Sequence, residues 1–183
     1  MKKYFILYKP FLLFLGKFLF TYLLLTFVYQ TYLNQFDVEK NENDGFTEIV
    51  AKQTAQVMFF FNCDVKIAPN TKEPAVNLYY NQYHIARIVE GCNALSVIIL
   101  FISFIVAFSG TIKATALYLV CGTILIHLLN VIRIALLCIV LYHLPKQKQL
   151  FHDILCPLFI YGVVFLLWII WVNKFSNYAK KNN

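Results

Sequence analysis

Charged residues are scarce in this chain. Asp, Glu, Lys and Arg make up 14% of its 183 residues, well below the roughly 25% of soluble domains, whereas 60% of the residues are hydrophobic. Gly and Pro are also few, at 6 and 5 residues, and no repeat or flexible linker stands out. These shortages exclude an ordinary soluble domain and a chain of several linked domains. We therefore expect one membrane domain over residues 1–183.

Paired cysteine motifs are missing as well. Five cysteines occur, but no C-x-x-C pair, which argues against a thioredoxin-type redox motif and a structural zinc site. Nothing in the sequence predicts a cofactor. The formal net charge of +7 would be typical of nucleic-acid binding in a soluble protein. Here the basic residues mainly flank long apolar runs, so the charge indicates orientation in a lipid bilayer and no nucleic-acid partner.

Four apolar runs are long enough to cross a hydrocarbon core of about 30 Å, which takes ~20 helical residues. They cover residues 11–29, 93–108, 114–142 and 154–172. No small-residue cleavage site follows the first run, so we expect it to remain as an anchor. The predicted fold is an all-α polytopic membrane protein with about four transmembrane helices.

The charges predict the orientation. Lysines precede the first run, lie between the second and third, and follow the fourth, whereas all nine acidic residues fall in residues 30–91 and 143–153. Cytoplasmic loops are enriched in Lys and Arg. We therefore expect cytoplasmic N and C termini and an outer segment over residues 30–91.

The outer segment has two predicted parts. Residues Phe46 to Phe61 alternate apolar and polar positions in the manner of a helix lying at the membrane interface. Val65–Ile67, Ala75–Tyr80 and Tyr83–Val89 are short and rich in β-branched and aromatic residues, with a turn signal at Asn81-Gln82. They predict a small extracytoplasmic β-hairpin or three-stranded flap.

Three residues with useful chemistry lie at the outer ends of three predicted spans. If the second helix starts near Gly91, Cys92 lies in its first turn, where free N–H groups and the helix dipole favour a thiolate. Arg133 is nearly 30 Å along the third span, and an arginine in an apolar run usually faces a polar interior. His152 precedes the fourth span. A thiol, a guanidinium and an imidazole are the parts of a cysteine acyl-transfer site.

Each of these residues also has a structural interpretation. An apolar-helix cysteine is commonly a small core residue, Arg133 could snorkel towards the interface, and an interfacial histidine is often just solvated. His127, Asn130 and Arg133 form a predicted polar stripe on the third span. Cys156 is the rival nucleophile, but its apolar neighbours disfavour a thiolate.

Three ordered segments carry a family resemblance. They are Glu90-Gly91-Cys92-Asn93-Ala94-Leu95, Asn130-Val131-Ile132-Arg133, and His152. In this order they resemble the signatures of the exosortase and archaeosortase family, and the chain's size is similar to that of the short F-type exosortases of bacteria. Family members often show Ser or Thr and then Gly after the cysteine, where this chain has Asn93 and Ala94.

The resemblance implies an exosortase-like cysteine protease or transpeptidase of the bacterial inner membrane, with its active site facing the periplasm. Cys92 would be the nucleophile, Arg133 a charge partner and His152 the proton-transfer residue. The supporting residues are expected to be Glu90, Asn93, Asn130 and Asp153. The implied partners are membrane-anchored exported proteins with C-terminal sorting tails, besides the lipid bilayer itself.

Two other classes of function stay open. One is a non-enzymatic scaffold subunit of an envelope export or assembly complex, which predicts an unreactive Cys92. The other is a quinone-linked thiol oxidoreductase that uses Cys63 and Cys92, although such enzymes normally depend on paired redox cysteines.

Overall fold

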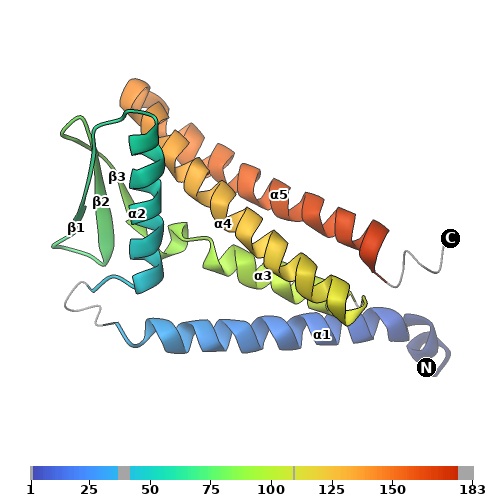
Figure 1. The fold of residues 1–183 in the computed structure, drawn as a ribbon. Coiled ribbons are helices and arrows are strands. Elements are labelled where there is room, and N and C mark those ends of the chain that lie inside the picture. The colour runs from blue at the N-terminus through green and yellow to red at the C-terminus, as the bar shows by residue number, and fades with distance from the viewer. Residues whose placement is uncertain (1, 37–41, 109, 177–183) are drawn as a thin grey trace.

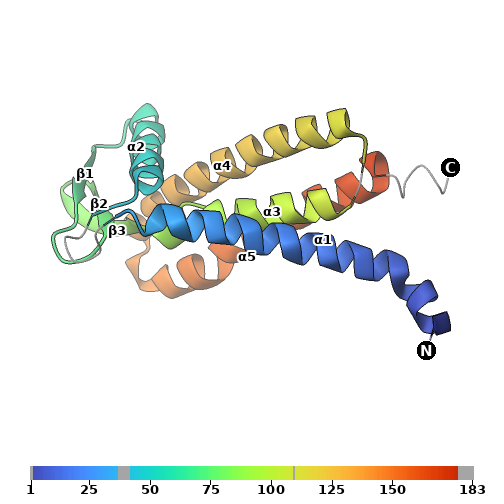
Figure 2. The same ribbon diagram turned by 90° about the horizontal axis from the view of Figure 1, so that it is seen from below.

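The structure is a computed structural model, and it describes residues 2–36, 42–108 and 110–176. Long helices run along the molecule, and a small sheet with a crossing helix covers one end of them (Figure 1). The start of the first helix and the end of the last lie at the same end of the molecule, away from the sheet (Figures 1 and 2).

All four predicted apolar runs form helices. They are α1 (Lys2–Leu33), α3 (Leu95–Ala107), α4 (Ile112–His143), and a last helix over Leu150–Phe175 in which α5 (Cys156–Ile170) lies between two π-helical turns. Within the described residues, three segments are long and apolar enough to cross a membrane: Tyr8–Leu33, Ile112–His143 and Leu150–Phe175. The 13 residues of α3 extend only about 20 Å. The predicted count of four spans is therefore not confirmed.

The short helix α3 lies at the centre of the bundle, where it packs against α1, α4 and α5. Phe101 of α3 is fully buried, and Gly122 of α4 makes room for its ring. A Cβ atom at Gly122 would lie 2.3 Å from Phe101 Cζ. This close approach lets α4 and α5 enclose α3 with an apolar core.

Helix α2 (Gly45–Phe60) confirms the helix predicted over Phe46 to Phe61. Asp44 caps its start by accepting a hydrogen bond from the Thr47 N–H at 2.9 Å. Its buried face includes Val50, Ala51 and Met58, which pack with residues of the sheet and α4. Its placement at a membrane interface stays a prediction.

The three predicted strands are also confirmed. β1 (Val65–Pro69), β2 (Ala75–Tyr80) and β3 (Tyr83–Val89) form an antiparallel sheet in the order β1-β2-β3. Asn81 and Gln82, at φ 49° and 68°, make the two-residue turn that such φ values favour. Because β2 is central, β1 and β3 are the two edges of the sheet.

Candidate active site

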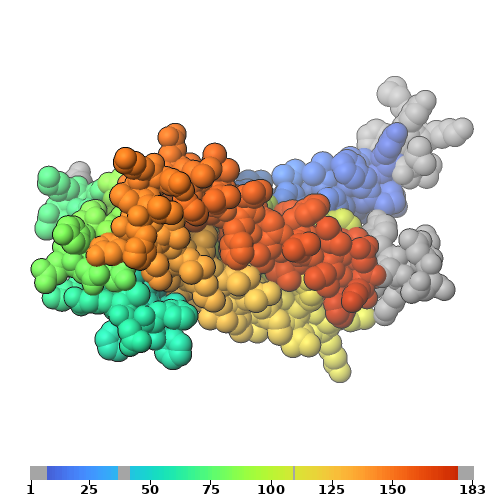
Figure 3. All heavy atoms as spheres, turned by 90° about the horizontal axis from the view of Figure 1, so that it is seen from above, coloured from blue at the N-terminus to red at the C-terminus, as the bar shows by residue number. Residues whose placement is uncertain are grey.

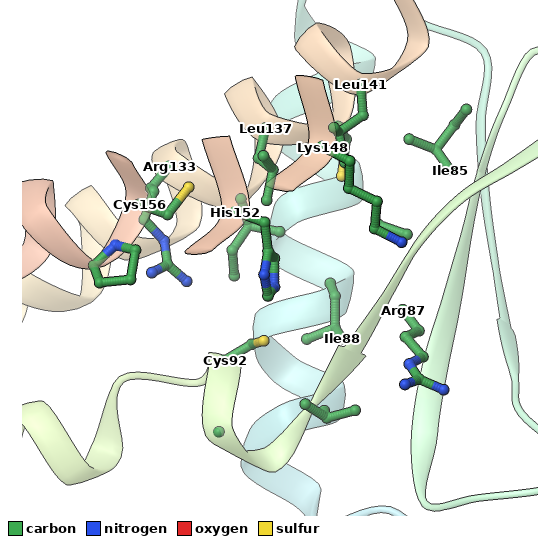
Figure 4. A pocket seen from close by; sticks show the side chains of 16 residues that line it. Ile85, Arg87, Ile88, Cys92, Arg133, Leu137, Leu141, Lys148, His152 and Cys156 are labelled. Atoms are coloured by element: carbon green, nitrogen blue, oxygen red, sulfur yellow. The ribbon is translucent and has the colours of Figure 1, made fainter. Parts of the chain in front are cut away.

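A cavity of about 370 Å³ lies between β3, the chain after it, α4 and the start of the last helix. Figure 4 shows its lining, and in Figure 3 the orange atoms at the start of the last helix lie against the green atoms of the sheet. The side chains with reactive or charged groups that line it are Arg87, Cys92, Arg133, Cys138, Lys148, His152 and Cys156. The structure thus brings together the three residues that the sequence predicted for a cysteine site.

Cys92 lies outside α3, so its predicted place in the first turn of that helix is wrong. It ends a 3₁₀ turn over Glu90–Cys92, and α3 begins only at Leu95. Two hydrogen bonds explain why α3 begins later in the chain than predicted. The Leu95 N–H donates to Asn93 Oδ1 at 2.9 Å, and the Cys92 carbonyl accepts from Asn130 Nδ2 at 2.9 Å. The dipole of α3 is therefore not aligned on the Cys92 thiol in the way the sequence interpretation assumed.

A buried polar network holds this turn in place. Asn93, only 1% exposed, donates through Nδ2 to Thr47 Oγ1 at 3.2 Å and to the Tyr29 hydroxyl at 3.4 Å. The Tyr29 hydroxyl in turn donates to the Glu90 carboxylate. The network ties the Cys92 turn to α1 and α2, while Asn130 ties it to α4.

The sequence interpretation missed Tyr29 and Thr47. Tyr29 ends an apolar run that is rich in aromatic residues, and Thr47 is one of several polar residues of an amphipathic helix. Neither pattern distinguishes a network residue from its neighbours. The supporting residues that the sequence did predict are in or beside this turn: Glu90 is part of it, Asn93 follows it, and Asn130 donates to the Cys92 carbonyl.

Arg133 extends from α4 into the cavity (Figure 4). Its Nε atom is buried and has no hydrogen-bond partner within the described ranges. No acidic side chain is among the lining residues, and Arg87, the other arginine of the lining, is already paired with Glu73. Arg133 is thus a cation available to a negative charge that develops inside the cavity.

His127 lies outside the cavity. The predicted polar stripe of His127, Asn130 and Arg133 therefore does not face a single site. His127 Nε2 lies 2.7 Å from Gln53 Oε1 of α2, and His127 is not among the cavity residues. Residues six apart on an α-helix point in different directions, because 3.6 residues make one turn.

His152 lies in the π-helical turn Leu150–Leu155. Pro157 explains this widened turn, since it lacks an N–H and its ring conflicts with the carbonyl four residues earlier, and the Cys156 N–H donates instead to Phe151 O. The Asp153 carboxylate accepts a hydrogen bond from His152 Nδ1 at 2.7 Å. This leaves Nε2 as the ring nitrogen without a hydrogen-bond partner among the described residues. In Figure 4 the His152 ring and the Cys92 sulfur both point into the cavity.

The five cysteines are all free and differ in access. Cys138 and Cys156 line the cavity but are 0% and 9% exposed, whereas Cys92 is only partly buried. Cys63 and Cys121 are not cavity residues. Of the three cavity thiols, Cys92 is therefore the most accessible to a substrate.

Comparison with known proteins identifies a family. A family model described as transmembrane exosortase matches residues 6–170. No curated protein matches the chain, and no solved structure matches it.

Proposed function

Because the matched model covers most of the chain, this protein belongs to the transmembrane exosortase family, and we propose that it is a membrane-embedded cysteine peptidase or transpeptidase. Its substrates are exported proteins whose C-terminal sorting tails include a hydrophobic span. One observation carries the proposal: Cys92, Arg133 and His152 come from three separate elements and line one cavity. A purely structural role for each residue would not require them to meet.

The arrangement supports a sequence of acyl-transfer steps. His152, oriented by Asp153, takes the proton of the Cys92 thiol, and the thiolate attacks a peptide carbonyl of the substrate. Arg133 stabilises the negative oxygen of the tetrahedral intermediate. The protonated imidazole then gives its proton to the leaving amine, which departs with the tail. The remaining thioester is resolved by water in a hydrolase or by an amine in a transpeptidase.

The proposed location is the bacterial inner membrane, with the active site on the periplasmic side. The distribution of lysines and acidic residues along the chain supports this orientation. The positions of the helix ends are consistent with it, since α1 starts and the last helix finishes at the same end of the bundle, away from the sheet (Figure 1), whose strand β3 lines the cavity.

Trapping the thioester tests the proposal. The tagged full-length enzyme is isolated from membranes of its own bacterium after an acid quench, which preserves thioesters, and adducts are mapped by mass spectrometry. We expect on Cys92 the part of an exported protein that precedes its sorting tail, with the hydrophobic span already released, and no adduct in the Cys92→Ala variant. Cys121→Ala is the matched control, because Cys121 is exposed and lies outside the cavity. It should retain the adduct.

Two outcomes contradict the proposal. An adduct on Cys156 that persists in Cys92→Ala would show that Cys156, and not Cys92, is the nucleophile. The absence of any adduct, together with unchanged substrate processing in Cys92→Ala, would favour the scaffold interpretation.

A further inference from the structure

The edge strand β3 forms a continuous part of the cavity wall. Five consecutive residues of it, Ile85 to Val89, line the cavity. Side chains of successive strand residues point to opposite faces of a sheet, so a cavity lying over one face would contact alternate residues only. Contact with five in succession indicates that the cavity borders the free edge of β3, where the backbone is accessible.

The register of the sheet shows which backbone groups lie on that edge. Ala75 O accepts from Asn70 N at 2.9 Å, and Asn81 N donates to Asp64 O at 2.9 Å. Both bonds lie on the β1 side of β2. Because alternate residues of an antiparallel strand bond to opposite neighbours, β2 uses residues 76, 78 and 80 towards β3.

The partners of these three residues on β3 are Ile88, Ala86 and Tyr83. Arg87 and Val89 lie between or beyond them and so direct their N–H groups to the free edge, as does the Arg87 carbonyl. No hydrogen bond to these groups is found within the described part of the chain. They are available to another strand.

The other edge of the sheet has a proline at one of its outward positions. The same alternation places residues 65, 67 and 69 of β1 on its outer side, and one of these is Pro69. A proline at an outward position costs the sheet no hydrogen bond and prevents a further strand from pairing there. The described part of β3 contains no proline. Of the two edges in the described sheet, the proline-free one is therefore the edge that borders the cavity with Cys92.

We propose that the substrate segment ahead of the scissile bond binds in extended form to the free edge of β3, as an added strand. This inference rests on the proposed function. Main-chain hydrogen bonds to Arg87 and Val89 supply the docking, and β3 leads directly into the Glu90–Cys92 turn, so a bound segment is delivered to the thiol. The strand adds parallel to β3, because β3 continues into the apolar helix α3 just as the segment continues into the hydrophobic tail.

Proline substitution tests the edge, with the Cys92 adduct in native membranes as the readout. Arg87→Pro removes the outward N–H without removing a bond to β2, whereas Arg87→Ala removes the same side chain and keeps the N–H. We expect about tenfold less adduct in Arg87→Pro than in Arg87→Ala, as for the loss of about one well-formed hydrogen bond. Ile67→Pro, at an outward position of β1, is the matched control and should form the adduct normally.

Hydrogen exchange gives a second measurement on the wild-type chain. In the isolated adduct, the amides of Arg87 and Val89 should exchange more slowly than in the free enzyme, while those of Val65 and Ile67 stay unchanged. This result decides the matter if Arg87→Pro fails to insert. Equal adduct in the two Arg87 variants, or unchanged exchange at Arg87 and Val89, overturns edge docking and leaves the proposed function intact. A wild-type enzyme that forms no adduct, together with unchanged substrate processing in Cys92→Ala, overturns both.

Discussion

The two ends of the helical bundle are stabilised by different interactions, hydrogen bonds at one end and apolar packing at the other. At the Cys92 end, the turn over Glu90–Cys92 is fixed by hydrogen bonds from Asn130, Asn93 and Tyr29. At the Trp171 end, the fully buried indole ring packs 4.9 Å from the Tyr118 ring and directly over Gly110. Trp171 Nε1 adds one bond to Phe108 O at 3.0 Å.

The two kinds of interaction contribute differently to stability and to the positioning of side chains. Apolar packing stabilises an assembly but tolerates small shifts of its members. Hydrogen bonds to a backbone carbonyl and to a buried amide fix orientation as well as distance. The Cys92 end therefore has the contacts expected where a thiol must be held in one orientation. The Trp171 end has the contacts expected where helices need only to be packed stably.

Removing Trp171 should give the largest change in stability. Trp171→Ala is expected to cost about 3–5 kcal/mol, as for large aromatic residues in other cores, and to lower the thermal unfolding midpoint in detergent. Activity per folded molecule should persist. Phe159→Ala is the control, since Phe159 is 47% exposed on the same helix, and it should unfold at nearly the wild-type temperature. A loss of activity in folded Trp171→Ala would show that the two ends are coupled.

Arg133→Lys should change activity with little change in stability. It keeps the positive charge but lacks the planar fork of donors, so we expect at least a ~100-fold fall in processing rate, within the range for a lost oxyanion donor. Lys52→Ala, which removes an exposed cation paired with Glu48, should process normally. Normal rates in Arg133→Lys would mean that charge alone is needed.

Asn130→Ala should lower both stability and activity. It leaves the Cys92 carbonyl without its partner, which costs roughly 1–3 kcal/mol for a buried group, and it frees the turn that carries the thiol. We expect a lower kcat with little change in KM. Asn77→Ala, on the sheet and outside the cavity, serves as the comparison. An Asn130→Ala enzyme with full kcat would assign the bond to stability alone.

Tyr29→Phe should have the smallest effect. It removes only the hydroxyl shared by Glu90 and Asn93, worth about 1 kcal/mol, and should lower the processing rate several-fold. Tyr32→Phe, one turn later on α1, provides the matched control. If both variants behave alike, the contact between α1 and the Cys92 turn does not position the thiol.

Most secondary structure of the protein could be predicted from the sequence. The four apolar runs became helices, and the three β-branched stretches became strands with a turn at Asn81-Gln82. These features depend on local periodicity and on turn residues, which a single sequence displays. The family resemblance, carried by residues around Cys92, Arg133 and His152, was confirmed by the match over residues 6–170.

The sequence by itself thus determined the helices, the strands and the residue types available for chemistry. Only the tertiary structure decided that α3 starts at Leu95, that Tyr29 and Thr47 support the Cys92 turn, and that the free edge of β3 borders the cavity. The physical reason is distance along the chain. Tyr29 and Glu90 are 61 positions apart, and no local pattern encodes a contact between segments that meet only when the chain has folded.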